Sequence, residues 1–448
     1  MTNPNGIPAV GSSSGATALI RKIRDRSARV GVVGMGYVGV PTMVAAAQAG
    51  FSVIGVDTSE ERASLINAGQ SYIEDVKPAI LEPLVSQGLV SATTDYSRIK
   101  DLDVILVCVP TPITESNEPD LVPMEGAVSG LAKNLGQQQL IIFQSTTYPG
   151  HTEESVLPEL ESHGHKVGHD FYLAFALERI DPGNRDFVVR DLPKVLGGIT
   201  KSCAEVSSVF FEAFVDDIYV VSAPKVAEMT KLLENTFRSV NIALVNELSM
   251  LCHRMDIDIW EVVEAASTKP FGFMPFFPGP GVGGHCIPVD PFYLSWKAKE
   301  YDFHVNFIHL AAETNAYMPH YTLSRISEIM SDHDLPLSGA KVLVLGVTFK
   351  PDVDDTRNSP ALRVLELLMK NGADVSYLDQ HAPTIMVNDT KLTSVELNPE
   401  VIQGFDACVI MVNHENSDLK MIVENSTLVI DGQNATKGMS SSANIARI

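Results

Sequence analysis

A glycine-rich run between a predicted strand and a predicted helix constrains the fold of this chain more than any other feature. Residues 28–33 are apolar and β-branched, and residues 38–49 have the pattern of a helix. The two segments meet in the run Gly34, Met35, Gly36, Tyr37, Val38 and Gly39. A second predicted strand, at 52–56, is followed directly by Asp57. This acid lies roughly 20 residues after the first glycine. Strand, turn, helix and acid together form the dinucleotide-binding fingerprint.

Each part of the glycine run has its own physical reason. Gly34 suits the tight turn, Gly36 lets a pyrophosphate approach the backbone, and Gly39 lets helix and strand pack closely. The helix N-terminus, with the amides around Tyr37 and Val38, offers partial positive charge to the phosphates. A structural glycine turn that binds no ligand is the less favoured alternative.

The acid after the second strand indicates which dinucleotide binds. Asp57 would accept hydrogen bonds from the adenine ribose hydroxyls and would repel a 2′-phosphate. We therefore expect NAD rather than NADP, although Arg62 nearby weakens that preference slightly.

The strand–helix alternation continues and then recurs in the second half of the chain. Further strands are predicted at 103–109, 140–143, 341–346, 374–378, 407–412 and 427–430, with a helix at 360–371 and a more irregular stretch at 153–198. Such alternation predicts an α/β fold with two Rossmann-like, doubly wound parallel sheets. We expect a disordered leader at 1–20, an NAD-binding domain at 21–222, a helical connector at 223–325 and a second Rossmann-like domain at 326–448.

A long helix at about 224–255 joins the two predicted domains. Its apolar residues cover more than one face, which is typical of a helix buried between bodies. We interpret it as the central connector and as the seam of a homodimer or higher homo-oligomer. A long core helix of a monomer is the alternative.

Composition excludes several classes of protein. The chain has 448 residues and a net charge of −22, which argues against a nucleic-acid partner. Its five cysteines are odd in number and widely spaced, as expected of a cytoplasmic protein rather than a disulfide framework. No run approaches the roughly 20 apolar residues of a membrane helix.

A second motif carries the candidate chemistry. It reads Gly283, Gly284, His285, Cys286, Ile287, Pro288, Val289 and Asp290. The glycines allow a ligand to approach closely, and the thiol can attack it as a nucleophile. The carboxylate one turn later can accept and donate protons. A small buried cysteine in a tight turn is the alternative.

Six motifs in order give the chain a resemblance to the UDP-glucose/GDP-mannose dehydrogenase family. They lie at 34–39, 107–112, 145–150, 231–235, 283–290 and 349–357. The resemblance implies oxidation of a nucleotide sugar's primary 6-alcohol to a carboxylate with two NAD. The residues at 178–184 and 268–273, with His285 and Pro288, resemble the UDP-N-acetylhexosamine branch. The implied substrate is UDP-N-acetyl-D-glucosamine or UDP-N-acetylgalactosamine, with UDP-N-acetylmannosamine and UDP-glucose as alternatives.

The resemblance also implies roles for individual residues. Cys286 would capture the aldehyde and carry a thioester. Lys231 and Asn235 would stabilise oxyanions, and Asp290 and Thr146 would hold a water. Glu178 would act as base in thioester hydrolysis, although Ala176 and Leu177 replace the usual Ser-Pro before it. The implied cofactor contacts include Pro110, Thr111, Thr146 and Arg357, and the implied substrate contacts are Glu178, Arg179, Lys231, Asn235, Gly283, His285 and Lys350.

Several alternatives stay open at this point. Arg357 could instead pair with Asp352, Asp354 or Asp355, and His285 could activate the thiol or bind the sugar. We expect no metal at the acids around Asp352 or at the histidines of 163–169, where a solvated loop is the default. A two-electron dehydrogenase or epimerase, and an inactive NAD-binding regulator, are the rival functions.

Overall fold

The structure is a computed structural model that describes residues 14–114, 116–181, 183–184, 187–439 and 444–448. The chain divides into two compact units. Unit 1 contains the residues up to Glu234 together with Phe292–Tyr301, and unit 2 contains Asn235–Pro291 and Asp302–Ile448. The residues that we expected to form a separate connector, 223–325, are thus shared between the two units.

Unit 1 is built on an eight-stranded sheet in the order β3-β2-β1-β4-β5-β6-β7-β8. Every neighbouring pair is parallel except β6 and β7, which are antiparallel. The stretch 153–198, expected to be irregular, supplies both of these strands. The strands are β1 (Arg29–Val33), β2 (Ser52–Val56), β3 (Val90–Thr93), β4 (Val104–Val107), β5 (Gln139–Phe143), β6 (Phe171–Ala176), β7 (Lys194–Gly198) and β8 (Ile218–Val220).

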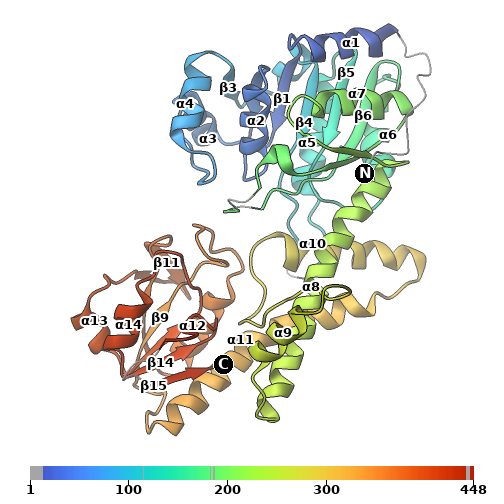
Figure 1. Cartoon of the computed structure of the whole chain (residues 1–448). Helices are drawn as coiled ribbons and strands as arrows, with labels where there is room; N and C mark the ends of the chain where they lie inside the picture. The colour runs from blue at the N-terminus through green and yellow to red at the C-terminus, as the bar shows by residue number, and fades with distance from the viewer. Residues whose placement is uncertain (1–13, 115, 182, 185–186, 440–443) are drawn as a thin grey trace. The chain divides into compact units, whose positions relative to one another are not determined.

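Helices cover both faces of this sheet, as expected for a doubly wound fold (Figure 1). Alternate strand residues point to opposite faces, so Val32 joins one core cluster and Val33 the other. The first face carries α1 (Ser14–Arg24), α2 (Gly39–Gln48), α3 (Glu60–Asn67), α4 (Pro78–Ser86) and α7 (Lys201–Phe211). The second carries η1 (Tyr96–Asp101), α5 (Val122–Asn134), η2 (Thr152–Val156) and α6 (Leu157–Glu161).

Helix α1 corrects the prediction of a disordered leader at 1–20. It begins at Ser14 and buries Ala16, Leu19, Ile20 and Ile23 in the first core cluster. These residues follow the i, i+3, i+4, i+7 spacing of an amphipathic helix, which the Gly/Ser-rich residues before them obscured. The prediction is therefore wrong for residues 14–20, and residues 1–13 lie outside the described part of the chain.

Unit 2 contains a five-stranded, fully parallel sheet in the order β10-β9-β13-β14-β15. Helices α11 (Asn306–Asp332) and α12 (Pro360–Lys370) pack on one face, and α13 (Pro399–Gln403) and α14 (Leu419–Asn425) on the other. The strands are β9 (Lys341–Leu345), β10 (Asp374–Leu378), β13 (Ala407–Ile410), β14 (Leu428–Asp431) and β15 (Asn444–Arg447). A hairpin of β11 (Thr384–Val387) and β12 (Thr390–Thr393) completes the unit. The sheets and the long helix confirm the predicted fold class.

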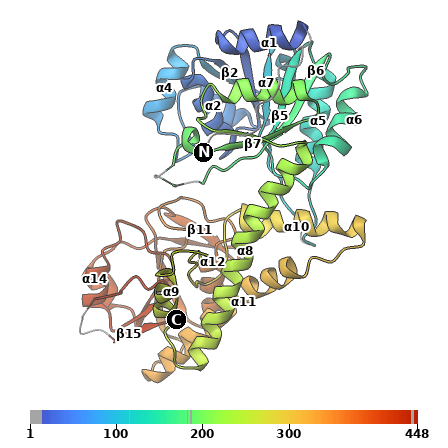
Figure 2. The ribbon, with the colours of Figure 1, turned by 45° about the vertical axis from the view of Figure 1, so that its right-hand side comes forward.

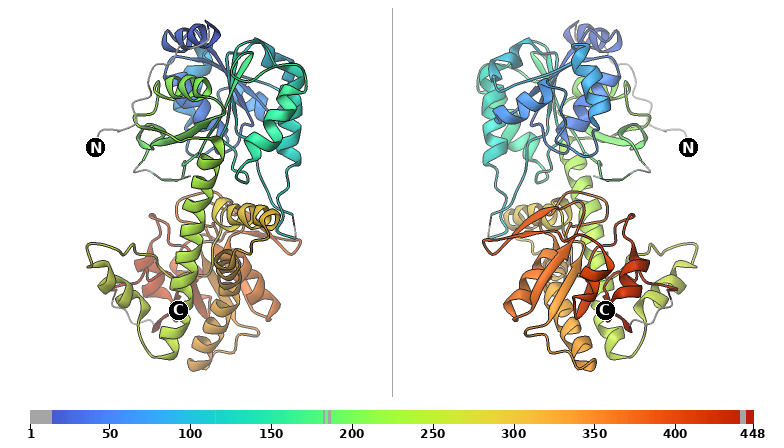
Figure 3. Two further views of the ribbon diagram at one scale, coloured as in Figure 1. Left: turned by 90° about the vertical axis from the view of Figure 1, so that its right-hand side faces the viewer. Right: turned by 90° about the vertical axis from the view of Figure 1, so that its left-hand side faces the viewer.

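Helix α8 (Pro224–Arg254) runs without a break in all views (Figures 2 and 3). It is followed by α9 (Ile259–Ser267) and by α10 (Cys286–Ala298). A row of apolar side chains on α8, continued by Met255 just after the helix ends, is exposed at helical spacing. We call this row the α8 stripe: Val226, Met229, Leu233, Phe237, Leu244, Leu248, Leu251 and Met255. Within the described residues, none of the helices has the length and apolar character needed to cross a membrane.

Candidate active site

The three glycines of the fingerprint differ in what surrounds them. Gly34 has φ +91° and donates its N–H to the carbonyl of Val56 at 2.8 Å. A Cβ on Gly39 would lie 1.9 Å from the Gly34 oxygen, so a side chain there would disrupt the turn. A Cβ on Gly36 would meet no described heavy atom within 4 Å. Gly36 thus leaves open the side of the turn that a pyrophosphate needs.

Asp57 lies beside this turn and is buried. Its carboxylate accepts hydrogen bonds from the backbone N–H of Met35 at 2.7 Å and of Ser59 at 3.0 Å. The Arg62 guanidinium lies 3.6 Å from it. The Tyr72 hydroxyl donates to the Met35 carbonyl at 2.7 Å, and burial raises the pKa of Tyr72 to about 12. The phenol therefore remains a donor, and the turn is held from both sides.

The start of α2 fits the phosphates of a dinucleotide. Among the described residues, its N-cap residue Val38 makes no side-chain capping bond, and its first turn carries no acid. The amides from Tyr37 to Gly39 therefore point to where an anion gains most from the helix dipole. With the open Gly36 and the carboxylate of Asp57, the residues present fit NAD.

Three other predicted cofactor residues, Pro110, Thr111 and Thr146, follow β4 and β5 at the same carboxyl edge of the sheet. Ser145 donates its hydroxyl to the Val109 carbonyl at 2.8 Å, which joins the two loops. Thr111 is buried, Pro110 is exposed and Thr146 is half-buried. This edge is where open α/β sheets bind ligands.

Sequence reasoning missed a buried acid that clamps the second loop. Glu228 of α8 accepts hydrogen bonds from Gly150 N at 2.6 Å and from Thr152 N and Oγ1 at 3.0 and 2.6 Å. Burial raises the pKa of Glu228. Glu228 lies one turn before Lys231, so it ties the helix that carries Lys231 to the loop that carries Thr146.

Glu178, the predicted base, is engaged on both oxygens. Oε2 receives Lys194 Nζ at 2.8 Å and Gln144 Nε2 at 3.0 Å. Oε1 receives the backbone N–H groups of Arg179 and Ile180, each at 2.7 Å. Burial alone would raise the pKa of Glu178, but the Lys194 charge and these hydrogen bonds outweigh it and hold the pKa below its usual value. These four hydrogen bonds favour the ionised carboxylate and fix its orientation.

Two residues of α8, Lys231 and Glu234, contact this segment. Lys231 Nζ donates to the backbone carbonyl of Glu178 at 2.6 Å. Arg179, predicted to bind substrate, directs its guanidinium to the carboxylate of Glu234 and to the Pro193 carbonyl at 2.7 Å. An ammonium has three N–H donors, so the Glu178 carbonyl uses one of those on Lys231.

The cysteine motif lies in unit 2, and its thiol begins α10. Cys286 is exposed and is the first residue of α10. Partial positive charge at a helix N-terminus favours a thiolate. Asp290 lies one turn later and is buried, and the side-chain amide of Asn235 donates a hydrogen bond to it. The thiol and the carboxylate thus share one helix face, as the spacing predicted.

The two glycines before the thiol are required by close packing. A Cβ on Gly283 would lie 2.8 Å from Phe349 Cβ and 2.9 Å from the Asn358 carbonyl. Gly284 has φ +79°, and its N–H donates to the Arg357 carbonyl at 3.0 Å. The motif therefore packs against the loop that carries Phe349 and Lys350. The Lys350 ammonium lies 5.7 Å from the Phe349 ring centroid.

The charges beside the thiol bear on two of the open alternatives, the role of His285 and the partner of Arg357. Burial and the Arg357 charge hold the pKa of His285 below its usual value. His285 is therefore neutral at neutral pH and supplies no cation to the thiol. Arg357 pairs with Asp355 at 2.6 Å, one of the partners considered from the sequence.

Asp352, His381 and His414 bring possible metal-ligand atoms within 4.8 Å of one another. His414 Nδ1 accepts from the Asp352 N–H at 3.0 Å, so the proton lies on Nε2, which donates to Asp379 at 3.1 Å. Both ring nitrogens of His414 are therefore used in hydrogen bonds, and the cluster is a hydrogen-bond network.

A cavity of about 260 Å³ opens in unit 2 at the carboxyl ends of β9, β10 and β13. Its rim repeats the turn of unit 1, with Gly346 at φ +78° and Val347 N donating to Asp379 at 2.7 Å. Asp379 also receives Thr348 N, His381 N and His414 Nε2. A carboxylate with this many donors has little acceptor capacity left for a ribose, which argues against a second dinucleotide site.

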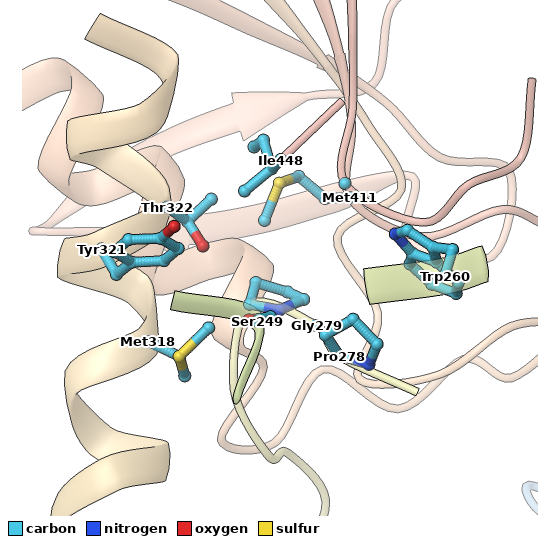
Figure 4. Close-up of a pocket in the computed structure, with 11 residues that line it drawn as sticks. Ser249, Trp260, Pro278, Gly279, Met318, Tyr321, Thr322, Met411 and Ile448 are labelled. Carbon is cyan, nitrogen blue, oxygen red and sulfur yellow. The ribbon is translucent and has the colours of Figure 1, made fainter. Parts of the chain in front are cut away.

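A much smaller cavity, about 20 Å³, lies beside Trp260, Tyr321 and Met411 in the same unit (Figure 4). The buried indole N–H of Trp260 has no hydrogen-bond partner among the described residues. The volume suits one water molecule and excludes a nucleotide.

The fold and these sites define an NAD-dependent dehydrogenase with two α/β units joined by a long helix. The chain belongs to the UDP-glucose/GDP-mannose dehydrogenase family. Residues 28–215 match the family's NAD binding domain, 225–317 its central domain and 343–438 its UDP binding domain. It is thus an NAD-dependent UDP-sugar dehydrogenase.

Its relatives act on different sugars. The chain is 34% identical to a UDP-N-acetyl-D-mannosamine dehydrogenase of Pyrococcus horikoshii, over 91% of this chain and 96% of that protein. It is 37% identical to a UDP-N-acetyl-D-glucosamine 6-dehydrogenase of Pseudomonas aeruginosa, over 78% and 82% of the two chains. A solved structure of UDP-D-ManNAc dehydrogenase from P. horikoshii matches with TM-score 0.84 and 32% identity, over 94% of this chain and 99% of that one.

Proposed function

We propose that this enzyme oxidises the C6 hydroxyl of a UDP-N-acetylhexosamine to the uronic acid through a covalent intermediate on Cys286. The observation that carries the proposal is the exposed thiol at the start of α10, one turn before the buried Asp290. A single alcohol-to-aldehyde oxidation needs no nucleophile, whereas oxidation of the aldehyde does.

The oxidation from alcohol to carboxylate takes four steps. The alcohol loses a hydride and a proton to give an aldehyde. The Cys286 thiolate adds to the aldehyde carbon, and protonation of the oxygen gives a thiohemiacetal. Loss of the second hydride and of the hydroxyl proton gives a thioester, and water then cleaves the C–S bond to release the carboxylate and the thiol. Bound NAD supplies the acceptor for each hydride, so one sugar yields two NADH.

The chain's own residues hold charge and water during these steps. Lys231 would stabilise the developing alkoxide with N–H donors beyond the one used by Glu178. Asn235 fixes the Asp290 carboxylate, which with Thr146 would hold the attacking water. Lys350 and His285 would contact the UDP-sugar, and Arg357 the cofactor pyrophosphate.

For the sugar, we propose UDP-N-acetyl-D-glucosamine or UDP-N-acetylgalactosamine, which would feed surface polysaccharide or glycan synthesis. The motif at 178–184 and the UDP-N-acetyl-D-glucosamine 6-dehydrogenase of P. aeruginosa support this choice. A relative from Ralstonia nicotianae is an NDP-N-acetyl-D-galactosaminuronic acid dehydrogenase, 35% identical over 93% of this chain. UDP-N-acetylmannosamine and UDP-glucose are the alternatives.

A substrate panel tests the proposal. The three UDP-N-acetylhexosamines and UDP-glucose are compared for kcat/KM and for NADH formed per sugar consumed. The expected result is two NADH with the gluco or galacto sugar and with no free aldehyde. One NADH per sugar, or no turnover with any of the four, would contradict the four-electron reaction.

We further propose a cytoplasmic homodimer or higher oligomer. The α8 stripe exposes large apolar side chains, which in a single chain would remain in water. A second copy of the same helix would cover them by an isologous contact.

A further inference from the structure

A buried carboxylate ties the start of α8 to the segment that follows β5. The side chain of Glu228 has 0% exposure. Its Oε2 accepts the Gly150 N–H, and its Oε1 accepts both the N–H and the hydroxyl of Thr152. All three donors are neutral, and among the described residues no ion pair compensates the charge. Burying a carboxylate without a cation is costly, so this arrangement needs an explanation.

Gly150 and Thr152 lie where the segment changes from a loop into a helix. Gly150 has φ +103°, a backbone conformation that favours glycine. The helix that follows, η2, is a turn of π-helix, a form that occurs frequently at functional sites. The loop before it carries Thr146, a predicted contact of the cofactor. Glu228 therefore holds the end of the loop that carries Thr146.

The same face of α8 carries Lys231 one turn later. Residues three apart on a helix are neighbours on its surface, so the side chains of Glu228 and Lys231 leave the helix on the same side. Lys231 Nζ donates to the carbonyl of Glu178, which follows β6. The strands β5 and β6 are neighbours in the sheet. One face of α8 is thus bonded to the segments that follow two adjacent strands.

The position of the Lys231 ammonium depends on how well the helix that carries it is fixed. Its side chain is a flexible four-carbon stem, so a shift or rotation of α8 would move Nζ away from the developing charge. A misplacement of about 1 Å can slow a reaction about 100-fold. Lys225 also links α8 to η2, through Glu153 at 3.5 Å, but the lysine is exposed and such a pair contributes little. The buried bonds of Glu228 are therefore the main attachment of this part of α8 to η2.

We propose that Glu228 is a positioning residue of the reaction, which holds α8 against the segment after β5 so that the Lys231 ammonium lies at the developing alkoxide. In this scheme Glu228 contacts neither substrate nor cofactor and acts through Lys231. The inference rests on the proposed function and deepens it, because it names the residue on which charge stabilisation by Lys231 depends.

Single-turnover kinetics of Glu228→Gln separate positioning from a purely structural role. Glutamine has the same shape, but its NH2 group would face Gly150 or Thr152, donor against donor. At saturating NAD and sugar, we expect the rate constant for the first NADH to fall at least tenfold. The amplitude, which counts the competent sites, should stay close to that of the wild type. A lower amplitude with an unchanged rate constant would mean that Glu228 only maintains the folded fraction, and would overturn the proposal.

Thr152→Val is a milder variant for the case that Glu228→Gln does not fold. It removes one donor and leaves the carboxylate and both backbone N–H groups in place. We expect a rate constant about threefold lower at unchanged amplitude, because one of three bonds is lost. A wild-type rate constant in Thr152→Val would contradict the positioning role.

A double-mutant cycle with Lys231→Met tests whether Glu228 acts through Lys231. That background has no ammonium to position, so Glu228→Gln should lower the single-turnover rate constant by less than a further factor of about two. The same tenfold fall in both backgrounds would show that Glu228 acts independently of Lys231, and the proposal would be wrong.

Thr230→Val is the matched control on the same helix. Thr230 lies between the two residues, and its hydroxyl donates to the Val226 carbonyl of α8 itself. Its rate constant and amplitude should equal those of the wild type. Failure of the proposed function would appear in the wild-type enzyme, as fewer than two NADH per sugar, whereas failure of this inference appears only among the variants.

Discussion

The side-chain amide of Asn235 on α8 donates a hydrogen bond to the carboxylate of Asp290 on α10, and both side chains are buried. Removing the donor leaves a buried acceptor without it, so Asn235→Leu should lower the free energy of unfolding by roughly 1–3 kcal/mol. It should also reduce kcat, because Asp290 loses its orientation. Asn241→Leu is the matched control, since its side-chain amide donates a hydrogen bond to the Phe237 carbonyl of its own helix. Equal effects of the two substitutions on kcat would contradict the role of this pair.

The open space at Gly36 predicts a variant that folds but binds the cofactor poorly. Gly36→Ala adds a Cβ with no described neighbour within 4 Å, so the thermal midpoint should stay unchanged. The methyl group would occupy space needed by the pyrophosphate, and the KM for NAD should rise about tenfold, equivalent to about 1.4 kcal/mol. Gly126→Ala, also open but in helix α5, should leave the KM for NAD unchanged. A normal KM for NAD in Gly36→Ala would place the phosphates elsewhere.

Asp57 should control the choice between NAD and NADP. Asp57→Asn can still accept the Met35 N–H but loses the charge that repels a 2′-phosphate. We expect the ratio of kcat/KM for NAD to that for NADP to fall by about tenfold or more, and Arg62 beside it should assist NADP binding. An unchanged ratio would show that Asp57 does not face the ribose.

His151 predicts how stability depends on pH. Burial lowers the pKa of His151 to about 4, whereas the unfolded chain binds that proton near the ordinary value of 6.5. The contribution of His151 to the free energy of unfolding is therefore constant above about pH 6.5 and falls as the pH is lowered towards 4. At about pH 5 the loss amounts to about 2 kcal/mol. His151→Gln should reduce the difference in free energy of urea unfolding between about pH 7.5 and pH 5 by this amount. The exposed His163→Gln is the control, and an unreduced difference in His151→Gln would refute the assignment.

The α8 stripe predicts the oligomeric state. Leu244→Glu with Leu248→Glu places charges in the middle of the exposed row, so sedimentation should show monomers where the wild type shows dimers. Val122→Glu, which also replaces an exposed apolar side chain but lies outside the stripe, should leave the assembly intact. Dimers of the double variant would place the interface on another surface.

Local patterns predicted much of this fold. The strands at 52–56 and 374–378 and the fingerprint turn follow from hydrophobic runs, glycines and one acid, which act over a few residues. Helix α1 was missed although its apolar spacing was readable. The hairpin β11–β12 was also missed, although Asn388 and Asp389, at φ +46° and +62°, are the residue types that favour such a turn.

Contacts between distant segments could not be read from the sequence. Lys194 looks like an ordinary surface lysine at the start of a strand, and only the antiparallel pairing of β6 and β7 brings it to Glu178. The sequence likewise suggests that Glu228 is an acid on a helix surface. Its hydrogen-bond partners, however, are the backbone N–H groups of Gly150 and Thr152. The sequence suggested candidate groups for the chemistry, but the partners that hold them depend on tertiary packing.

Cys286 as a covalent carrier is the central claim, and intact-protein mass spectrometry tests it most directly. The enzyme is mixed with UDP-N-acetylglucosamine and NAD and quenched in acid during turnover, with Cys286→Ser and Cys252→Ser as test and control. We predict a mass increase of one oxidised UDP-sugar on the wild type and on Cys252→Ser, mapped by proteolysis to Cys286. Cys286→Ser should still bind NAD but form neither thioester nor acid. Normal acid formation by Cys286→Ser would contradict the account.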